Sequence, residues 1–291
     1  MGADIKAIRA RIKSVDSTRH ITKAMELVAS SKIRRAGARM ESSRFYRQIM
    51  LDAFSDLALE KSVYSAPRSR TKPVLYIIVA GDRGLAGGYN NNIFRSSMTL
   101  MRDNDLVLPI GKRAVEYYAH HSHIVSSEFV SVENFSAEES AKIAYLVRDM
   151  YDREEISAVD LIYTKYVSML SQSPDITYLL PLERGKNRKG SEDTAGKAVT
   201  DAETPAAPVV VEYEPSPEEV LAAVIPEYIS GVLYSSVMES YASELAARRS
   251  AMDTATKNAD EMMENLNLEY NRARQGAITQ EITEIIAGAN A

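Results

Sequence analysis

Apolar residues recur at helical spacing over long stretches at both ends of this chain. Near the start, four of them follow steps of three, four and three residues, which places them on one face of a helix. They are Ile5, Ile8, Ile12 and Val15. Residues 3–60 contain no proline, and Gly37 is their only glycine. The pattern predicts one N-terminal helix over residues 1–62.

The C-terminal quarter repeats this pattern on a larger scale. Five apolar residues step by three, four, three and four, which is the spacing of a coiled-coil seam. They are Met252, Ala255, Ala259, Met262 and Leu266. Four isoleucines between residues 278 and 286 then form an apolar tip. We expect a second long helix over residues 215–291, with Pro217 in its first turn.

The two ends carry opposite charge. Residues 1–50 hold twelve Lys or Arg against four Asp or Glu, whereas residues 217–291 hold five against twelve. Helices of this length gain stability by packing against each other, and opposite charge favours an antiparallel pair. The sequence therefore predicts a long antiparallel coiled coil of the N- and C-terminal helices. The bare isoleucine tip indicates that other proteins cover it.

Between the helices, strand and helix patterns alternate. Val74–Ala80 is an apolar strand run, and a glycine-rich turn separates it from a predicted helix at Asn91–Met101. The alternation continues through Leu106–Ile110, Lys112–His121, Ile124–Val130, Ala137–Tyr151, Val159–Val167, Ile176–Leu182 and Val209–Tyr213. It predicts a Rossmann-like α/β domain with a mostly parallel sheet over residues 70–214. Residues 185–208 have little apolar bulk, and we expect a mobile insertion there.

Composition removes several classes of function. The chain has no cysteine, which excludes disulfides, thiolate metal sites and thiol nucleophiles. Its start lacks the apolar stretch of a signal peptide, and no 18 consecutive apolar residues predict a bilayer span. The basic N-terminal arm leaves nucleic-acid binding as an alternative, but no aromatic residues are interleaved among its basic ones from Lys6 to Arg39.

The glycine-rich segment Gly81–Asn92 follows a strand and opens a helix, a position where phosphates are often bound. Its spacing fits neither GxGxxG nor GxxxxGK[ST]. The alternative of a nucleotide-binding α/β module with a coiled-coil arm stays open. A tight turn is the simpler interpretation, with Asp82 and Arg83 pairing locally or contacting a partner.

His120, His121 and His123 raise the question of a metal site. No carboxylate stands at a spacing typical of a closed site, and adjacent histidines on a helix point apart. Histidines at a helix C-terminus, where they suit the helix dipole, are the favoured interpretation. We expect no catalytic residue, no metal and no cofactor.

Four segments together resemble one family, the gamma subunit of the F-type ATP synthase. IKAIRARIKSVDSTRHITKAMELVASSKIRRA (Ile5–Ala36) is similar to its first shaft helix, and GDRGLAGGYN (Gly81–Asn90) to its central loop. YEPSPEEVL (Tyr213–Leu221) resembles the entry to the last helix. The stretch from Ser243 to Ala289, SELAARRSAMDTATKNADEMMENLNLEYNRARQGAITQEITEIIAGA, resembles the C-terminal signature. These segments cover about a third of the chain.

The resemblance implies a non-catalytic central-stalk rotor subunit. Its coiled coil would thread a ring of three alpha and three beta subunits, and its α/β domain would bind the epsilon subunit and the c-ring. Proton flow would turn the shaft, on the cytoplasmic face of a bacterial inner membrane. The implied contacts with the alpha/beta ring are Lys23, Met25, Arg34, Arg35, Arg274, Gln275, Ile278, Ile282 and Ile285, and those of the epsilon/c-ring foot are Arg83 and Tyr213.

This sequence departs from the family pattern in the upper shaft and in the insertion. Gly276 stands where the family has alanine, which costs an exposed helix about 1 kcal/mol. The 185–208 insertion has no counterpart in the family that we can align.

Overall fold

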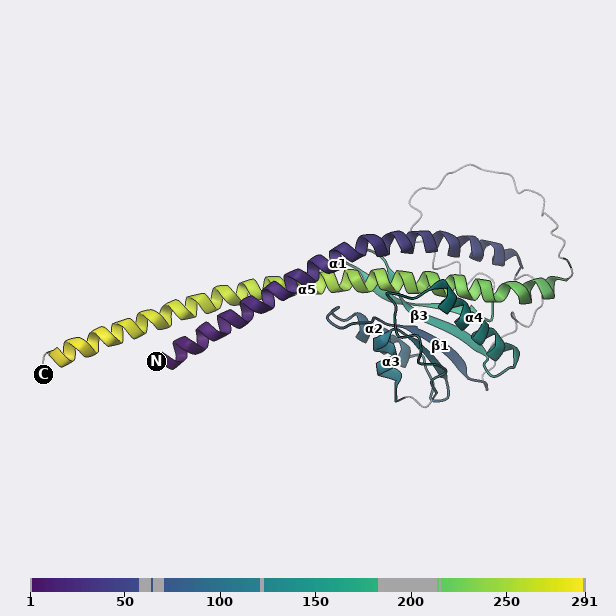
Figure 1. Ribbon diagram of the computed structural model, residues 1–291. Coiled ribbons are helices and arrows are strands. Elements are labelled where there is room, and N and C mark those ends of the chain that lie inside the picture. The colour runs from purple at the N-terminus through teal and green to yellow at the C-terminus, as the bar shows by residue number, and fades with distance from the viewer. Residues whose placement is uncertain are drawn as a thin grey trace. The chain divides into compact units, whose positions relative to one another are not determined.

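A computed structural model describes residues 2–57, 64, 71–120, 123–182, 214 and 216–289 (Figure 1). The predicted 185–208 insertion and the predicted strand at Val209–Tyr213 lie outside these residues.

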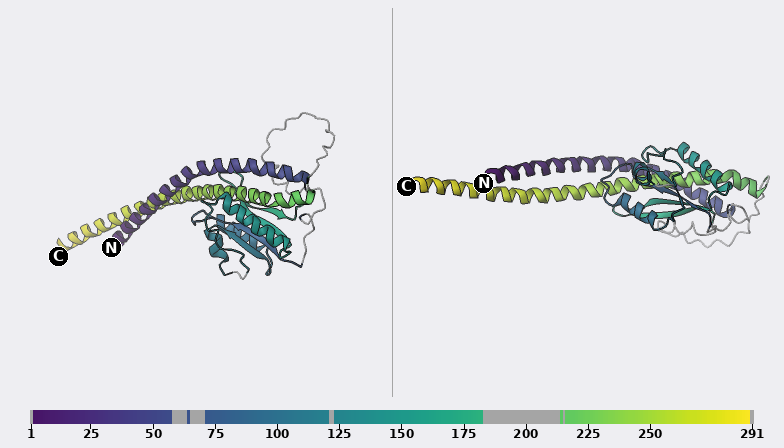
Figure 2. Two further views of the ribbon diagram at one scale, coloured as in Figure 1. Left: turned by 45° about the vertical axis from the view of Figure 1, so that its right-hand side comes forward. Right: turned by 90° about the horizontal axis from the view of Figure 1, so that it is seen from below.

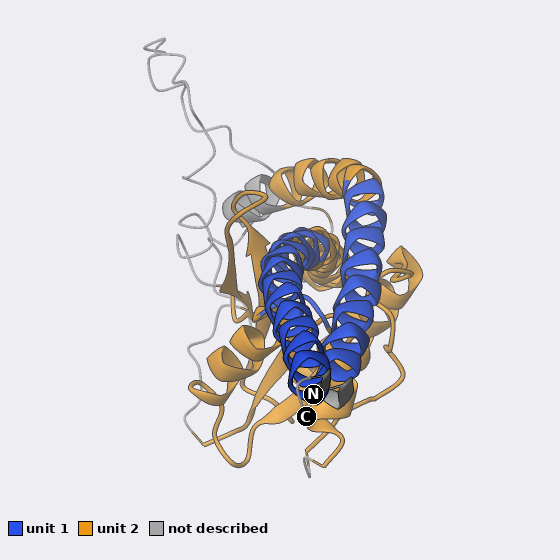
Figure 3. Ribbon diagram, turned by 90° about the vertical axis from the view of Figure 1, so that its left-hand side faces the viewer, with its two compact units in different colours: residues 1–33, 85–87, 245–291 blue, residues 34–84, 88–244 orange. Residues whose placement is uncertain are grey.

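The chain divides into two compact units, coloured separately in Figure 3. Unit 1 comprises residues 1–33, 85–87 and 245–291. Unit 2 comprises residues 34–84 and 88–244. The two long terminal helices, α1 (Gly2–Leu57) and α5 (Pro217–Ala289), each contribute to both units.

In unit 1, α1 and α5 lie side by side and run in opposite directions (Figure 3). Thr22 Oγ1 lies 2.8 Å from Thr256 Oγ1, and Arg19 Nε donates to Asp260 Oδ1 at 2.5 Å. Residue numbers therefore fall along one helix as they rise along the other. The fold class predicted from the sequence, an antiparallel helix pair plus an α/β domain, is confirmed on this point.

The predicted seam of α5 is wrong at Met262, whose side chain is 45% exposed. Met252, Ala259 and Leu266 are buried as expected, and Thr256 is buried between the first two. The observed seam is therefore Met252, Thr256, Ala259 and Leu266, with steps of four, three and seven residues. This seam is favoured because the Thr256 hydroxyl hydrogen-bonds to the Met252 carbonyl oxygen, so a polar residue is accommodated in it.

Unit 2 contains a four-stranded sheet in the order β2-β1-β3-β4. Its strands are β1 (Val74–Val79), β2 (Leu106–Ile110), β3 (Ala158–Tyr166) and β4 (Gln172–Leu180). β1 pairs in parallel with both β2 and β3, whereas β4 is antiparallel to β3. The mostly parallel sheet predicted from the sequence is confirmed.

Three further helices belong to unit 2: α2 (Tyr89–Met98), α3 (Lys112–Tyr118) and α4 (Ala137–Asp152). Ser136 begins α4 with a capping box, because its hydroxyl accepts the Glu139 N–H while the Glu139 carboxylate accepts the Ser136 N–H. Figure 2 shows α4 running beside the strands, and its Ser140 hydroxyl donates to the Ser230 carbonyl oxygen of α5.

The strand predicted at Ile124–Val130 does not form. Only Ile124 makes an isolated parallel bridge, to Val107 of β2. Further along, the Glu128 N–H bonds to the Ser126 hydroxyl at 3.4 Å. Local side-chain bonds of this kind compete with a strand ladder. The segment still follows β2, because the Gly111 N–H bonds to the Phe129 carbonyl oxygen, but it forms no regular ladder.

The core on one face of the sheet lies between the strands and helices α2 and α3. Alternate strand residues point to this face, as strand geometry requires. The cluster consists of Tyr76, Ile78, Ala80, Ile93, Phe94, Val107, Ala114, Tyr118 and Ile162. Gly111 connects β2 to α3 with φ +93°, and a Cβ there would lie 2.1 Å from the Ala80 carbonyl oxygen. This junction therefore requires glycine.

One window within Glu219–Gly288 is apolar and long enough to cross a membrane. Most of that window is buried inside the protein, as in the core helix of a globular domain, so it is weak evidence for a membrane span.

Candidate interaction site

The glycine-rich loop after β1 is braced by its own neighbours. The Asp82 carboxylate accepts the backbone N–H groups of Val132, at 2.8 Å, and Glu133, at 3.1 Å. Asn90 closes the loop, because its side chain accepts the Gly81 N–H and donates to the Arg83 carbonyl oxygen. Asp82 therefore pairs locally, one of the two roles that the sequence suggested for it.

A second feature of this loop disfavours phosphate binding. A Cβ on Gly81 would lie 2.7 Å from the carboxyl carbon of Glu244, a buried residue of α5. A carboxylate so close to the loop would repel an anionic ligand. The glycine at position 81 is explained by the approach of α5.

The histidines do not form a metal site in the described part of the chain, where no group of three or more His, Cys, Asp or Glu side chains could hold a metal ion. α3 ends at Tyr118, so His120 lies just beyond the helix and not in the longer helix predicted from the sequence. The His123 carbonyl oxygen accepts the Val107 N–H of β2. His121 lies outside the described residues.

The expected ring contacts on α1 form a mixed polar and apolar face. Lys23 is exposed and its ammonium lies 2.9 Å from the Glu26 carboxylate, while Met25 is half-buried. Leu27 and Val28 are both more than half exposed, although they are large apolar residues. Arg34 and Arg35, which belong to unit 2, are exposed.

The expected contacts on α5 are all exposed, and within unit 1 they lie away from Lys23 and Met25 of α1. They are Arg274, Gln275, Ile278, Ile282 and Ile285, the last of them 71% exposed. Because Thr22 pairs with Thr256, the side chain of Arg274 lies about 27 Å further along the helix axis, at 1.5 Å per residue. The structure thus forms two separate surfaces. Of the two foot residues, Arg83 is exposed and Tyr213 lies outside the described residues.

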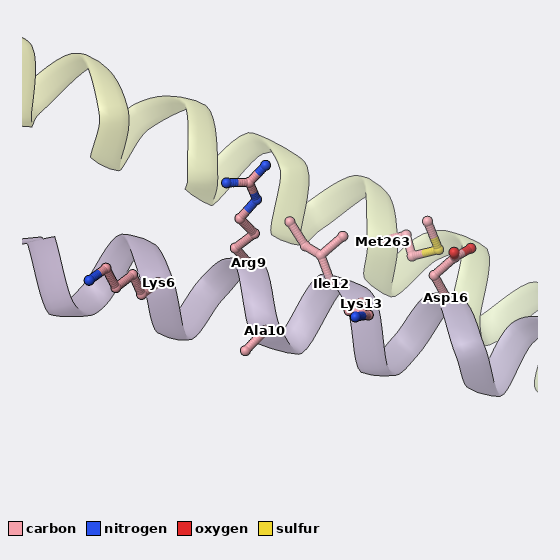
Figure 4. A pocket seen from close by; sticks show the side chains of 7 residues that line it. All are labelled: Lys6, Arg9, Ala10, Ile12, Lys13, Asp16 and Met263. Atoms are coloured by element: carbon pink, nitrogen blue, oxygen red, sulfur yellow. The ribbon is translucent and has the colours of Figure 1, made fainter.

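Sequence reasoning missed a basic groove between the two helices of unit 1 (Figure 4). It has a volume of about 590 Å³ and a floor that includes Ile12 and Met263. Its lining residues are Lys6, Arg9, Ala10, Ile12, Lys13, Asp16 and Met263. The signal was present in the sequence, since Lys6, Arg9 and Lys13 step by three and four and so share a helical face.

An antiparallel helix pair with exposed apolar and basic surfaces, together with a small, mostly parallel sheet, defines a stalk protein of the coiled-coil and α/β class. The sequence pattern that defines the family described as ATP synthase matches residues 4–291. The chain belongs to the ATP synthase gamma-chain family. The predicted family is confirmed, and so, at the level of the family, is the role of rotor subunit.

Several relatives support this assignment over their full length. The ATP synthase gamma chain of Ruminiclostridium cellulolyticum is 38% identical, across 100% of this chain and 99% of the relative. That of Alkaliphilus metalliredigens is 37% identical with the same coverage. The sodium ion specific gamma chain of Acetobacterium woodii is also 37% identical, again over 100% and 99% of the two chains.

Solved structures share the fold. A chain of the Euglena gracilis mitochondrial ATP synthase, from the OSCP/F1/c-ring assembly, superposes with a TM-score of 0.66 at 19% identity. The similarity covers 100% of this chain and 95% of the Euglena chain. A chain of the rotor of the same enzyme gives a TM-score of 0.62 at 17% identity, over 96% and 100% of the two chains.

Proposed function

We propose that this chain is the rotating shaft that couples ion flow through a membrane sector to ATP synthesis or hydrolysis in an alpha/beta ring. It performs no catalysis itself. The observation that carries the proposal is the antiparallel pairing of α1 with α5, which leaves the apolar end of α5 exposed. Exposed isoleucines on a helix need a protein to cover them, and a ring that encloses the shaft would do so.

The surface at Ile278, Ile282 and Ile285 turns within an apolar sleeve at the top of the ring. Apolar contact is non-directional, so a shaft can rotate against such a sleeve without meeting one deep energy well. Arg274 and Gln275, one turn below, meet the loops that grip the shaft, and each carries side-chain donors for that contact.

Lower on the shaft, Lys23, Met25, Arg34 and Arg35 face acidic loops of the beta subunits. The exposed arginines attract carboxylates over a Debye length of about 8 Å at physiological salt. The shaft must present faces of different charge and size to the three beta subunits, because coupling requires contacts of unequal energy. A shaft that contacted all three beta subunits with the same energy would shift no population between open and closed states.

The α/β unit serves as the foot that binds the epsilon subunit and the c-ring, with Arg83 and Tyr213 among its contacts. The complex is peripheral on the cytoplasmic face of a bacterial inner membrane. The choice of coupling ion, proton or sodium, lies in other subunits. The experiment below measures both ions, because one relative is named as sodium ion specific.

The test is reconstitution with cognate alpha, beta, epsilon and c subunits. We expect the chain to co-purify with the alpha/beta ring and to support ATP-driven acidification of vesicles, measured with a pH-sensitive dye and, in parallel, with radioactive sodium uptake. An assembled complex that hydrolyses ATP but pumps neither ion would contradict the proposal. Calorimetry of the isolated chain should detect no saturable ATP binding, and binding abolished by Arg83→Ala would support the nucleotide-binding alternative instead.

A further inference from the structure

Strand β3 continues beyond the end of its partner β1. The pairing of the two strands runs from Val74–Ala158 to Ile78–Ile162 among the described residues, whereas β3 extends to Tyr166. Alternate residues of a strand direct their N–H and C=O groups to the same edge. The backbone groups of Thr164 and Tyr166 therefore face an edge that β1 no longer covers. Unpaired, such groups would be costly in a buried position.

Side chains of α5 complete the ladder at Thr164. The Thr164 N–H donates to the Ser240 hydroxyl at 3.0 Å, and the Ser243 hydroxyl donates to the Thr164 carbonyl oxygen at 3.2 Å. Ser240 and Ser243 are fully buried. One turn of a helix thus supplies the donor and the acceptor that a neighbouring strand would supply.

At Tyr166 the same task falls to an ion pair between α5 and α1. The Tyr166 N–H donates to Glu239 Oε1 at 3.0 Å, and Arg44 Nη2 donates to the Tyr166 carbonyl oxygen at 3.1 Å. The two side chains also bond to each other, with 2.5 Å between Arg44 Nη2 and Glu239 Oε1. The Glu239 side chain is only 3% exposed. The Arg44 guanidinium of α1, the buried Glu239 carboxylate of α5 and the backbone of Tyr166 in β3 are therefore all bonded to one another.

A second arginine extends the connection to β4. Arg47 Nη1 lies 3.9 Å from Glu239 Oε2 and 3.4 Å from the Tyr163 hydroxyl, with its guanidinium 5.8 Å from the centre of the Tyr163 ring. The Tyr163 hydroxyl in turn donates to Asp175 Oδ2 at 3.4 Å. The network links α1, α5, β3 and β4, and all of its members belong to unit 2.

We propose that Glu239, Ser240, Ser243 and Arg44 are positioning residues that lock the two shaft helices to the sheet, so that torque passes between foot and shaft without slipping. Apolar contacts resist separation but not sliding, because they are non-directional. Here, a shift of one residue would leave the buried Glu239 carboxylate and the N–H groups of Thr164 and Tyr166 without partners. Burying such groups unpaired costs free energy. The inference rests on the proposed function.

The test uses the whole complex, reconstituted in vesicles, and measures the number of ions pumped per ATP hydrolysed as the ion gradient builds up. Two variants loosen the joint: Glu239→Gln, and the pair Ser240→Ala with Ser243→Ala, which leaves the ion pair in place. Glu227→Gln, an exposed glutamate of α5 in the same unit, is the matched control.

We expect both variants to lower the coupling ratio under load by about threefold or more. Glu239→Gln removes the charge that pairs with Arg44, and the serine pair removes the two hydrogen bonds to Thr164. ATP hydrolysis without load should stay close to that of the wild type. A merely structural role would reduce assembly and hydrolysis together and leave the ratio of the assembled complexes unchanged. If Glu239→Gln does not assemble, the serine pair decides the question.

A wild-type coupling ratio in the assembled variants overturns the inference and leaves the proposed function intact. Failure of the wild-type chain to couple at all refutes the proposed function, and the inference with it. The Thr164 and Tyr166 amides provide a second measurement, because their hydrogen exchange in the complex should accelerate in the serine and Glu239 variants respectively and stay unchanged in Glu227→Gln.

Discussion

Thr22 and Thr256 share a hydrogen bond of 2.8 Å across the helix pair of unit 1, and both side chains are buried. Each hydroxyl also lies within hydrogen-bond distance of a carbonyl oxygen of its own helix, Arg19 for Thr22 and Met252 for Thr256. Because each hydroxyl has one proton, one of them donates across the helix pair and the other donates to its own helix. The contact fixes the register of α1 against α5, because moving either helix by one residue would separate the two hydroxyls. This pair is therefore a sensitive reporter of the pairing.

The first prediction is that Thr22→Cys combined with Thr256→Cys forms a disulfide on mild oxidation. Oxygen atoms 2.8 Å apart bring the two β-carbons towards the separation of about 3.5–4.5 Å that disulfides need. The chain has no other cysteine, so the product is unambiguous. A shift in mobility on a non-reducing gel measures it, and should be reversed by a reducing agent.

The control for this experiment is Thr18→Cys with Thr254→Cys, two exposed positions on the same helices. It should cross-link at least about tenfold more slowly, because exposed side chains outside the seam are not held together. Equal rates for the two pairs would show that the helices do not keep this register.

The second prediction concerns Gly111. Replacing it with alanine should destabilise the chain by about 3 kcal/mol or more, because the backbone has φ +93° and the new Cβ would collide with the Ala80 carbonyl oxygen. Urea unfolding followed by circular dichroism measures the change.

Gly37 provides the matched substitution for that measurement. It lies within α1, and a Cβ there would meet nothing within 4 Å. Gly37→Ala should stabilise the chain by about 0.5–1 kcal/mol through helix propensity. Equal losses at the two positions would refute the geometry at the β2–α3 junction.

Deletion of residues 276–291 is the third prediction, and it concerns the exposed end of α5. The deletion removes Ile278, Ile282 and Ile285 but leaves the buried seam as far as Leu266. We expect assembly with the alpha/beta ring to persist, because the buried seam of the helix pair remains. The coupling ratio should fall by about twofold or more, because the shaft loses its apolar contacts with the ring. Complete loss of ATP hydrolysis in the assembled complex would show that the tip has a different role.

The fourth prediction concerns alkaline pH. The pKa of Tyr118 is raised to about 12, mainly by burial; the Ser97 hydrogen bond opposes this rise, and the neighbouring Tyr117 adds to it. In the unfolded chain the tyrosine pKa is about 10. The stability gained from the neutral phenol is therefore present in full below pH 10 and is lost as the pH rises from about 10 to 12.

Tyr118→Phe should remove this part of the alkaline loss. The difference in unfolding free energy between wild type and variant should shrink, or change sign, from pH 9.5 to 12 in urea titrations. Tyr145→Phe, at an exposed position, serves as the control. A difference that stays constant with pH would mean that Tyr118 is not buried in its neutral form.

Much of the fold followed from local patterns. Helical spacing of apolar residues predicted both long helices, with the lack of proline in residues 3–60 as further support for α1. Apolar runs predicted β1, β2 and β3 to within one residue at either end. These signals are strong because each depends only on the residues of its own segment. The register of the coiled coil was harder to predict, since two possible seams share Met252, Ala259 and Leu266. Whether Met262 or Met263 joins the seam depends on the position of the other helix.

The joint between helices and sheet could not be predicted. Glu239, Ser240 and Ser243 stand in a buried, largely apolar stretch of α5 that also holds the polar residues Ser235, Ser236 and Glu244. This composition was the available signal, because buried polar residues in an apolar helix must find partners. The partners themselves, Thr164 and Tyr166, lie more than seventy residues away in the sequence. Only the tertiary structure identifies them.

The outer edge of β2 has a consequence for the newly made chain. Residues 123–129 run along it, with the Val107 N–H bonded to His123 and the Gly111 N–H bonded to Phe129. An uncovered strand edge would accept a strand from another molecule and seed aggregates. Because this edge is occupied from within, a subunit waiting for its partners is protected there from β-type self-association. The exposed isoleucines of α5 are a separate surface, which assembly has to cover.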